Sequence, residues 1–361
     1  MTPASVLLPH VEGHGRLRLY LLVGYVLFIV YASLSPFSGW QDLGLSFRDV
    51  LTAPLLQTYL WFDAVVNVLA YLPLGLLLGS ILQTRLNASL GLMLALVGGL
   101  LLSVSMEYAQ MFLPSRTSSN LDILTNVAGS LAGGLLAITL LPTRLMLRVL
   151  VFKRALFVRN SDFGLTLIAL WAFAQVNPSL PMLGNVFITE VARQPFVPPP
   201  PDLFSWQESG GIACNLLMLG CLLLLLLRER RHAVGGLLLL LCAVSLVKFI
   251  AAAALLKSWA LFLWLNSEAM FGITAGLFCL AAAIALPQSG IRLLAWASGL
   301  AYLLLTYWLL DVSSPSSAMK LYQWRPHLLD YNGLTRTLSQ LLPYLYFIYL
   351  WRRESLSAHR L

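Results

Sequence analysis

Three pairs of polar side chains stand at helical spacing in an otherwise apolar chain. They are Asp63 with Asn67, Glu107 with Gln110, and Asp122 with Asn126, and Arg116 lies between the last two pairs. Residues three or four positions apart share one face of a helix, so each pair can present its polar groups together. Carboxylates, amides and a guanidinium in one place can bind a polar head group, hold a proton for acid–base chemistry, or cap helix ends.

The elements that must position these residues are apolar helices. Of the 361 residues, 59% are hydrophobic and 11% are charged, and the mean hydropathy is +0.80. Soluble domains are far more polar, and runs that can cross a ~30 Å hydrocarbon core recur along the whole chain. We therefore expect an all-α fold, a polytopic transmembrane helical bundle of about ten spans. The expected spans lie near 19–34, 61–82, 90–112, 121–141, 163–177, 207–227, 234–256, 260–286, 291–310 and 338–351.

The distribution of lysine and arginine predicts the orientation of this bundle. Most of the 23 basic residues fall on one side if the N-terminus is cytoplasmic, as the positive-inside rule requires. Both termini are then cytoplasmic, and the longest connections, 35–60, 178–206 and 311–337, lie outside. The stretch 19–34 resembles a signal sequence, but we expect an uncleaved helix, because an internal repeat matches it to an internal span.

This orientation brings the three polar pairs to one membrane depth. The second span enters from outside near Asp63, the third leaves near Glu107, and the fourth begins near Asp122. Ionised side chains at membrane depth are costly and are normally paired or turned into the bundle, so the set with Arg116 is a candidate site. A structural alternative stays open: the two aspartates can cap helix starts, and Glu107 with Arg116 can tie a tight turn.

A weak internal repeat divides the chain. At an offset of roughly 145 residues, "YASLSPF" at 31–37 corresponds to "AFAQVNPSLP" at 172–181. We expect a four-helix unit at 1–145, a degenerate second copy at 146–290, and two C-terminal helices at 291–361. An even number of helices per unit makes the two copies parallel.

Two charges lie inside predicted spans of the second copy. Lys248 occurs in "SLVKFIAAAALL" and Glu268 in "WLNSEAMFGITAG", and we expect them to form an intramembrane charge pair that fixes helix register. A second polar pocket or a proton site is the alternative. The glycine steps Gly75 to Gly79 and Gly129 to Gly133 predict close helix approach inside the chain.

The remaining residues argue against several functional classes. Four cysteines lie in apolar runs without a CxxC pair, and five histidines lie in loops or tails, so no metal site and no cofactor are expected. There is no phosphate-binding glycine loop and no Gly-x-Ser-x-Gly elbow, which disfavours an ATPase and a serine hydrolase. The net charge of +8 reflects basic loops between spans, so no nucleic-acid partner is expected.

The polar positions also resemble a known family. "FDAVVNVLAYLPLGLLLG" (62–79), "EYAQMFLPSRTSSNLDILTN" (107–126) and "VAGSLAGG" (127–134) are similar to the signature of the VanZ-like family over about residues 19–141. The resemblance implies a multi-pass protein of the bacterial cytoplasmic (inner) membrane, in a family whose founding member is associated with teicoplanin resistance. It implies that the seven polar residues listed first are the family's polar positions here. The chain departs from the pattern at Ser118 and Ser119, where the family often has an acidic residue.

These observations together lead to a functional hypothesis. The chain is expected to form an outward-facing polar pocket that binds or handles a lipid-linked glycan, a phospholipid or a glycopeptide-like ligand. Its partners would be membrane lipids or lipid-linked envelope precursors. Two alternatives stay open, namely an enzyme that modifies an envelope lipid, with Arg116 steadying phosphate charge, and a proton-coupled transporter or flippase.

Overall fold

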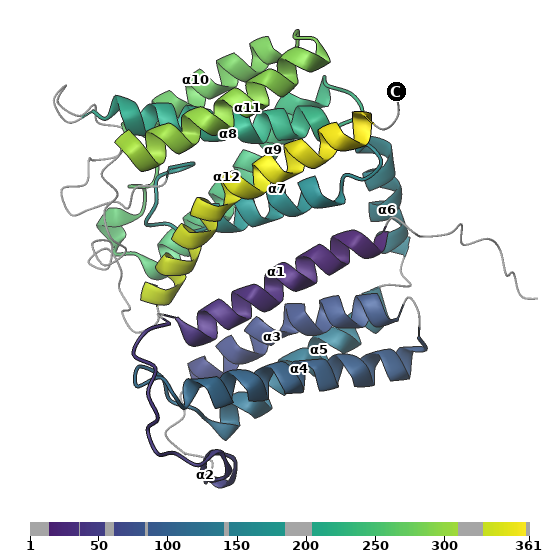
Figure 1. Ribbon diagram of the computed structural model, residues 1–361, viewed down its shortest axis with the longest axis vertical. Helices are drawn as coiled ribbons and strands as arrows, with labels where there is room; N and C mark the ends of the chain where they lie inside the picture. Colours follow the sequence, from purple (N-terminus) through teal and green to yellow (C-terminus); the bar gives the residue numbers. More distant parts are fainter. Residues whose placement is uncertain are drawn as a thin grey trace, which may run out of the picture. The chain divides into compact units, whose positions relative to one another are not determined.

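The computed structural model describes residues 14–35, 37–54, 61–83, 86–140, 144–184, 204–309 and 328–358. These residues form α-helices, one 3-10 turn and one π-helix, Leu305–Leu309, and no strand occurs among them (Figure 1). The α-helices are α1 His14–Leu34, α2 Phe47–Thr52, α3 Trp61–Leu82, α4 Ala88–Gln110, α5 Asn120–Leu140, α6 Arg144–Leu156, α7 Asp162–Gln175, α8 Trp206–Leu226, α9 His232–Leu255, α10 Ser267–Ala283, α11 Gln288–Leu304 and α12 Leu328–Ala358. The helical bundle expected from the sequence is confirmed.

Seven of the described helices are long and apolar enough to cross a bilayer. They are α1, α3, α4, α5, α8, α9, and α11 with the first π-helical residues. The other three predicted spans also coincide with helices, but α7 and α10 have 14 and 17 residues. At 1.5 Å per residue these two are shorter than the hydrocarbon core. The expected span at 260–286 is wrong in its first part, because α10 begins only after Asn266, whose side chain accepts a hydrogen bond from the Ala269 N–H.

The chain divides into two compact units, residues 1–153 and 154–361. The predicted C-terminal segment 291–361 is not separate, because α11 packs on α8 and α12 packs on α7 inside the second unit. The proline run "PFVPPPPD", expected to be extended, lies outside the described residues.

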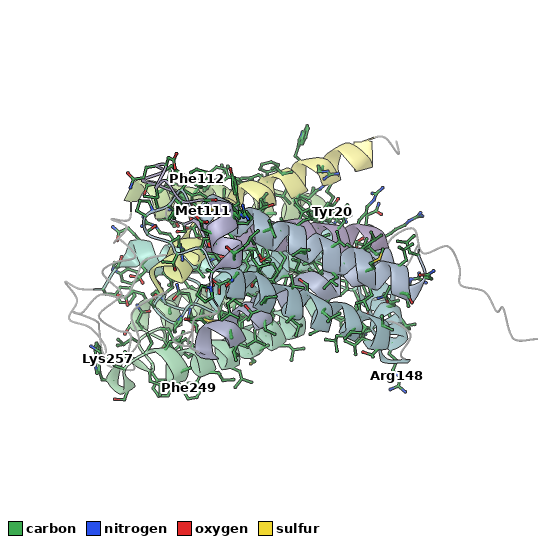
Figure 2. The ribbon with its side chains drawn as sticks, turned by 90° about the horizontal axis from the view of Figure 1, so that it is seen from below. Tyr20, Met111, Phe112, Arg148, Phe249 and Lys257 are labelled. Atoms are coloured by element: carbon green, nitrogen blue, oxygen red, sulfur yellow. The ribbon has the colours of Figure 1, made fainter. Side chains whose placement is uncertain are left out.

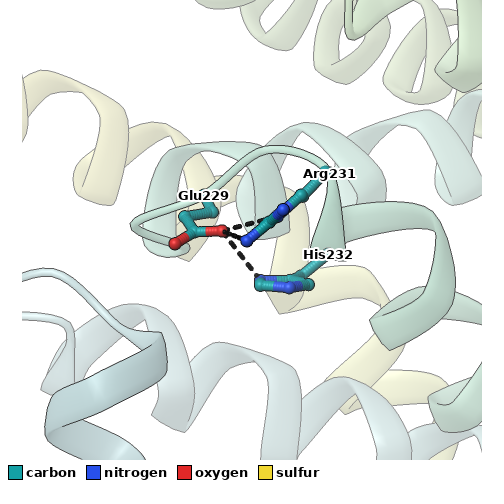
Figure 3. Close-up of polar contacts among 3 residues, drawn as sticks. All are labelled: Glu229, Arg231 and His232. Atoms are coloured by element: carbon teal, nitrogen blue, oxygen red, sulfur yellow. Dashed lines mark hydrogen bonds and ion pairs between the residues drawn. The ribbon is translucent and has the colours of Figure 1, made fainter.

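The second unit is built around α8. Its central apolar stretch is 83% buried, against 11–39% for the other spanning helices. A helix that is apolar on every face belongs in the centre of a bundle, and "LLMLGCLLLLL" has that character. The turn after α8 is exposed and holds Glu229, whose carboxylate pairs with Arg231 at 2.6 Å and lies 3.9 Å from His232 (Figure 3). Such surface pairs contribute little to stability.

The first unit is organised by the close approach of α3 and α5, which lie side by side with α1 and α4 in Figure 1. A Cβ atom at Gly129 would meet the Val68 carbonyl, and one at Gly133 would meet the Leu72 carbonyl. Gly75 in turn faces the backbone of Ser130. The predicted packing of these glycine steps inside the chain is thereby confirmed. Backbone contact of this kind lets polar side chains on the two helices meet directly.

Candidate functional site

The predicted site residues gather at one end of the first unit. Glu107 and Gln110 are in the last turn of α4, Asp122 is in the first turn of α5, and Arg116 is in the turn between them. Met111 and Phe112 of that turn lie at the end of the unit opposite to Arg148 (Figure 2). We call this end the mouth, defined by Asn67, Glu107, Gln110, Arg116 and Asp122.

Asn67 and Asp122 join α3 to α5 at the mouth. The Asn67 side-chain N–H donates to Asp122 Oδ1 at 2.6 Å, and both residues are partly buried. A hydrogen bond to a carboxylate is among the stronger kinds in proteins. The sequence-predicted polar faces of α3 and α5 therefore do converge.

Glu107 is buried and holds the start of α5. Its side chain is 3% exposed, and Oε2 accepts a hydrogen bond from the Ser119 N–H at 2.8 Å. The Ser118 hydroxyl donates to the Glu107 carbonyl at 2.9 Å. A carboxylate beside the first N–H groups of a helix is favoured by unsatisfied donors and by the helix dipole. The serines at 118 and 119, where the family pattern often has an acid, thus serve as partners of Glu107.

Arg116 and Gln110 hold the end of α1. Arg116 donates through Nη2 to the Ala32 carbonyl at 3.0 Å and to the Ser35 carbonyl at 2.9 Å. Gln110 Nε2 donates to the Ser33 carbonyl at 3.0 Å. The last carbonyls of a helix have no partner in the helix, and a cation is favourable there. These bonds support the structural interpretation for Arg116, although with the end of α1 as the partner rather than Glu107.

The polar contacts continue one turn deeper. Asn126, one turn after Asp122, donates through Nδ2 to Ser103 Oγ at 3.0 Å, and Ser103 is one turn before Glu107. Tyr71 is one turn after Asn67 and lies within electrostatic reach of Glu107 and Asp122.

A third level follows at Ser130, whose side chain lies where a Cβ of Gly99 would stand. We call the whole set the polar column, made of Asn67, Tyr71, Ser103, Glu107, Asp122, Asn126 and Ser130. Sequence reasoning missed Tyr71, Ser103 and Ser130. Each of them is four residues from a predicted site residue, so extending the same spacing would have found them.

Three polar atoms of the column make no hydrogen bond of good geometry with the described residues. They are Tyr71 Oη, Asn126 Oδ1 and Ser130 Oγ, of which Tyr71 Oη has the Ser103 hydroxyl nearby. Their residues are 4%, 6% and 0% exposed. A buried polar atom left without a partner costs about 1–3 kcal/mol, so the column has capacity for a water molecule or a ligand group. No cluster of three or more His, Cys, Asp or Glu side chains suited to a metal occurs in the described part of the chain.

Asp63 is the predicted site residue that the structure does not bring into this network. It lies in the first turn of α3 and is partly buried. Among the described residues it makes no hydrogen bond or ion pair with the mouth.

A short segment covers one side of the mouth. Residues 37–54, which we call the hood, contain α2 and are held by two contacts. The Gln41 N–H donates to the Phe112 carbonyl at 2.9 Å, and Asn120 Nδ2 donates to the Ala53 carbonyl at 2.7 Å. The Phe47 ring meets Tyr108 edge-on at 5.5 Å. The hood exposes five large apolar side chains, Phe37, Trp40, Leu43, Leu45 and Leu51.

The predicted Lys248–Glu268 pair is wrong. Lys248 is fully buried, and its Nζ donates to the Gln175 carbonyl at 3.0 Å and faces the Pro181 carbonyl at 3.5 Å. Glu268 accepts a hydrogen bond from the Ser205 N–H at 3.1 Å. The reason is the early end of α7 before Pro178, which leaves carbonyls inside the unit that Lys248 satisfies.

Comparison with known proteins agrees with this geometry. Residues 17–146 match the family VanZ/LLP1, and this stretch contains the mouth, the polar column and the hood. No curated protein and no solved structure matches the chain. The chain is therefore a membrane protein with a stretch in its first unit, residues 17–146, that is similar to the VanZ/LLP1 family.

Proposed function

We propose that the first unit binds the polar head group of an envelope lipid at its mouth. The ligand class is a lipid-linked glycan, a phospholipid or a glycopeptide-like molecule. One observation supports the proposal most directly. The same unit contains buried polar atoms without hydrogen bonds, in the column, and exposed apolar side chains, on the hood.

Charged and polar side chains border the mouth. Asp122 and Arg116 are partly buried; Asp122 lies in the first turn of α5, and the Arg116 N–H donates to the Leu113 carbonyl within the turn before it. Below them the column offers a phenol, an amide oxygen and a hydroxyl without partners. Preorganised donors and acceptors of this kind bind polar groups without a large reordering cost.

The hood supplies exposed apolar side chains next to the mouth. Trp40 is 47% exposed and Leu45 is 57% exposed, on a segment tied to the mouth. Tryptophan and leucine at the edge of a membrane-embedded unit favour the interface between lipid and water. A ligand that meets both surfaces has a polar head and an apolar body, which is the chemistry of a lipid.

The alternatives find less support. A transport path would need polar groups across the whole unit, whereas the column ends where Gly75, Gly99 and Ser130 pack closely. Lys248 and Glu268, which are compatible with a transporter as intramembrane charges, bond the Gln175 carbonyl and the Ser205 N–H. We place the chain in a bacterial inner membrane with the mouth outward and both termini cytoplasmic, and glycopeptide handling is one use of such a site.

Native mass spectrometry of the detergent-purified chain tests the proposal. Asp122→Asn and Glu107→Gln remove charge but keep an oxygen that can accept the Asn67 and Ser119 N–H groups. We expect wild type to retain a defined envelope lipid and both variants to lose most of it. Glu229→Gln, which removes an exposed carboxylate in the second unit, is the matched control and retains the lipid. Equal amounts of the same bulk lipid in all four proteins would contradict the proposal.

A further inference from the structure

The second unit contains a cavity that the proposed function does not use. It lies among α7, α8, α11 and α12 and has room of about 40 Å³. Most of its wall is leucine and aromatic side chain, and its polar lining residues are Gln175, Asn215, Tyr302, Ser339 and Tyr346.

The size of the cavity limits what it can hold. An apolar cavity that accepts a benzene ring measures about 150 Å³, whereas a water molecule needs about 10–15 Å³. The room of about 40 Å³ is large enough for about three water molecules.

Unsatisfied groups point into this space from α12. Ser339 and Tyr346 are 5% and 3% exposed, and neither Ser339 Oγ nor Tyr346 Oη makes a hydrogen bond of good geometry with the described residues, although the Ser298 hydroxyl lies near Tyr346. Pro343, which also lines the cavity, has no N–H to donate to the Ser339 carbonyl one turn earlier. Two turns of α12 therefore place two hydroxyls beside the cavity and leave the Ser339 carbonyl without its helical donor.

The opposite wall is fixed by a buried loop. Gln175 Oε1 accepts a hydrogen bond from the Leu183 N–H at 2.8 Å, and Asn215 Nδ2 donates to the Leu183 carbonyl at 2.8 Å. Leu183 has a φ of 65°, a backbone conformation that a branched residue keeps only when its surroundings hold it. These bonds tie Gln175 Oε1 and the Asn215 amide to the loop rather than to Ser339 or Tyr346.

We infer that the cavity binds a cluster of about three water molecules, held by the Ser339 hydroxyl and carbonyl and by the Tyr346 hydroxyl. Buried waters typically make about three hydrogen bonds to groups that would otherwise be unsatisfied. The cluster completes the hydrogen bonding of α12 at Pro343 and gives the second unit a hydrated polar site.

Radiolytic hydroxyl-radical labelling of the full chain in nanodiscs tests this inference, because bound water generates radicals inside a protein. Met218 lines the cavity and is 7% exposed, whereas Met182, which is 2% exposed in the same unit, does not line it. We expect Met218 to be oxidised several-fold faster than Met182. In the double variant Ser339→Ala with Tyr346→Phe the two rates become similar, and Tyr349→Phe on the same helix leaves the difference intact.

Pro343→Ala restores an N–H for the Ser339 carbonyl and is expected to lower the Met218 rate, which keeps the test available if the double variant does not fold. Equal, slow oxidation of both methionines in wild type would mean a dry cavity and overturn the inference. A fast Met218 rate that survives both the double variant and Pro343→Ala would also overturn it, because the water would then have other partners.

Discussion

The two units solve one structural problem in different ways. In each unit, a basic side chain donates hydrogen bonds to backbone carbonyls at the end of one helix. This helix is α1 in the first unit and α7 in the second. Arg116 does so from a partly exposed turn at the mouth, whereas Lys248 does so from the middle of α9 with no exposed surface. The first arrangement leaves a guanidinium near solvent, where a ligand can reach it. The second encloses the charge, so Lys248 serves packing alone.

The same contrast holds for the glycine-packed helix pairs. Gly133 brings α5 against α3, and Gly272 brings α10 against α8, where a Cβ would meet the Ser209 carbonyl and Ile212. In the predicted repeat, at an offset of roughly 145 residues, Asn215 corresponds to Asn67 and Glu268 to Asp122. Asn67 bonds Asp122, whereas Asn215 donates to the Leu183 carbonyl at 2.8 Å. The packing of the helix pairs is similar, but the amide has a different partner in each unit, and duplication stays a prediction.

Removal of the enclosed charge gives the largest expected effect. Lys248→Met removes the donor of the buried Gln175 carbonyl, whereas the Pro181 carbonyl keeps its bond from the Gly184 N–H. We expect a loss of about 3 kcal/mol in the free energy of unfolding. Unfolding in mixed SDS micelles, followed by tryptophan fluorescence, measures it. Lys257→Met, beyond the end of α9, is the control. Equal stability of wild type and Lys248→Met would show that the lysine does not hold the end of α7.

A larger side chain between α3 and α5 is expected to give the second largest loss of stability. Gly133→Ala places a methyl group against the Leu72 carbonyl and is expected to cost about 2 kcal/mol. Gly235→Ala in α9, where no atom lies within 4 Å of the added Cβ, is expected to be neutral or slightly stabilising. The same unfolding assay compares them, and a Gly133→Ala protein as stable as wild type would refute the close approach of α3 and α5.

A double-mutant cycle sharpens the comparison at the mouth. Asn67→Ala and Asp122→Ala, alone and together, should reveal a coupling of about 1 kcal/mol in the free energy of unfolding. The corresponding cycle at Asn215 and Glu268 should reveal less, since Asn215 donates to the Leu183 carbonyl and Glu268 accepts from the Ser205 N–H. Coupling of equal size in both units would show that the hydrogen bond between Asn67 and Asp122 does not distinguish the first unit from the second.

The exposed turn after α8 should show the smallest effect. Glu229→Gln breaks the surface pair with Arg231, and we expect a change below about 0.5 kcal/mol in the free energy of unfolding. A larger loss would mean that this turn is part of the core of the second unit.

Much of the first unit was predictable because its polar residues repeat at helical spacing. Helical spacing in the sequence predicts converging faces for Asn67, Glu107 and Asp122. Tyr71 lies four residues after Asn67, and Ser130 lies four residues after Asn126, so the same spacing also leads to them. The partners of Arg116 were not predictable, since spacing does not reveal that the end of α1 lies beside the turn.

The contacts of Lys248 and Glu268 in the second unit could not be predicted from the sequence either, because they depend on tertiary packing. Lys248 and Glu268 carry opposite charges on neighbouring helices, so pairing them was reasonable. Nothing in the local pattern reveals that α7 stops at Gln175 and that the chain folds back as a buried loop. Whether two charges meet depends on tertiary packing, which outweighs their formal attraction.

Photocrosslinking tests the central claim, binding of a lipid head group at the mouth, most directly. Wild-type protein in nanodiscs would receive a phospholipid or a lipid-linked glycan with a photoreactive head group, and crosslinked peptides would be mapped by mass spectrometry. The account predicts crosslinks concentrated in residues 107–126 and in the hood, reduced by Asp122→Asn and unchanged by Glu229→Gln. Crosslinks spread evenly over the ends of the lipid-facing helices, with no response to Asp122→Asn, would contradict it.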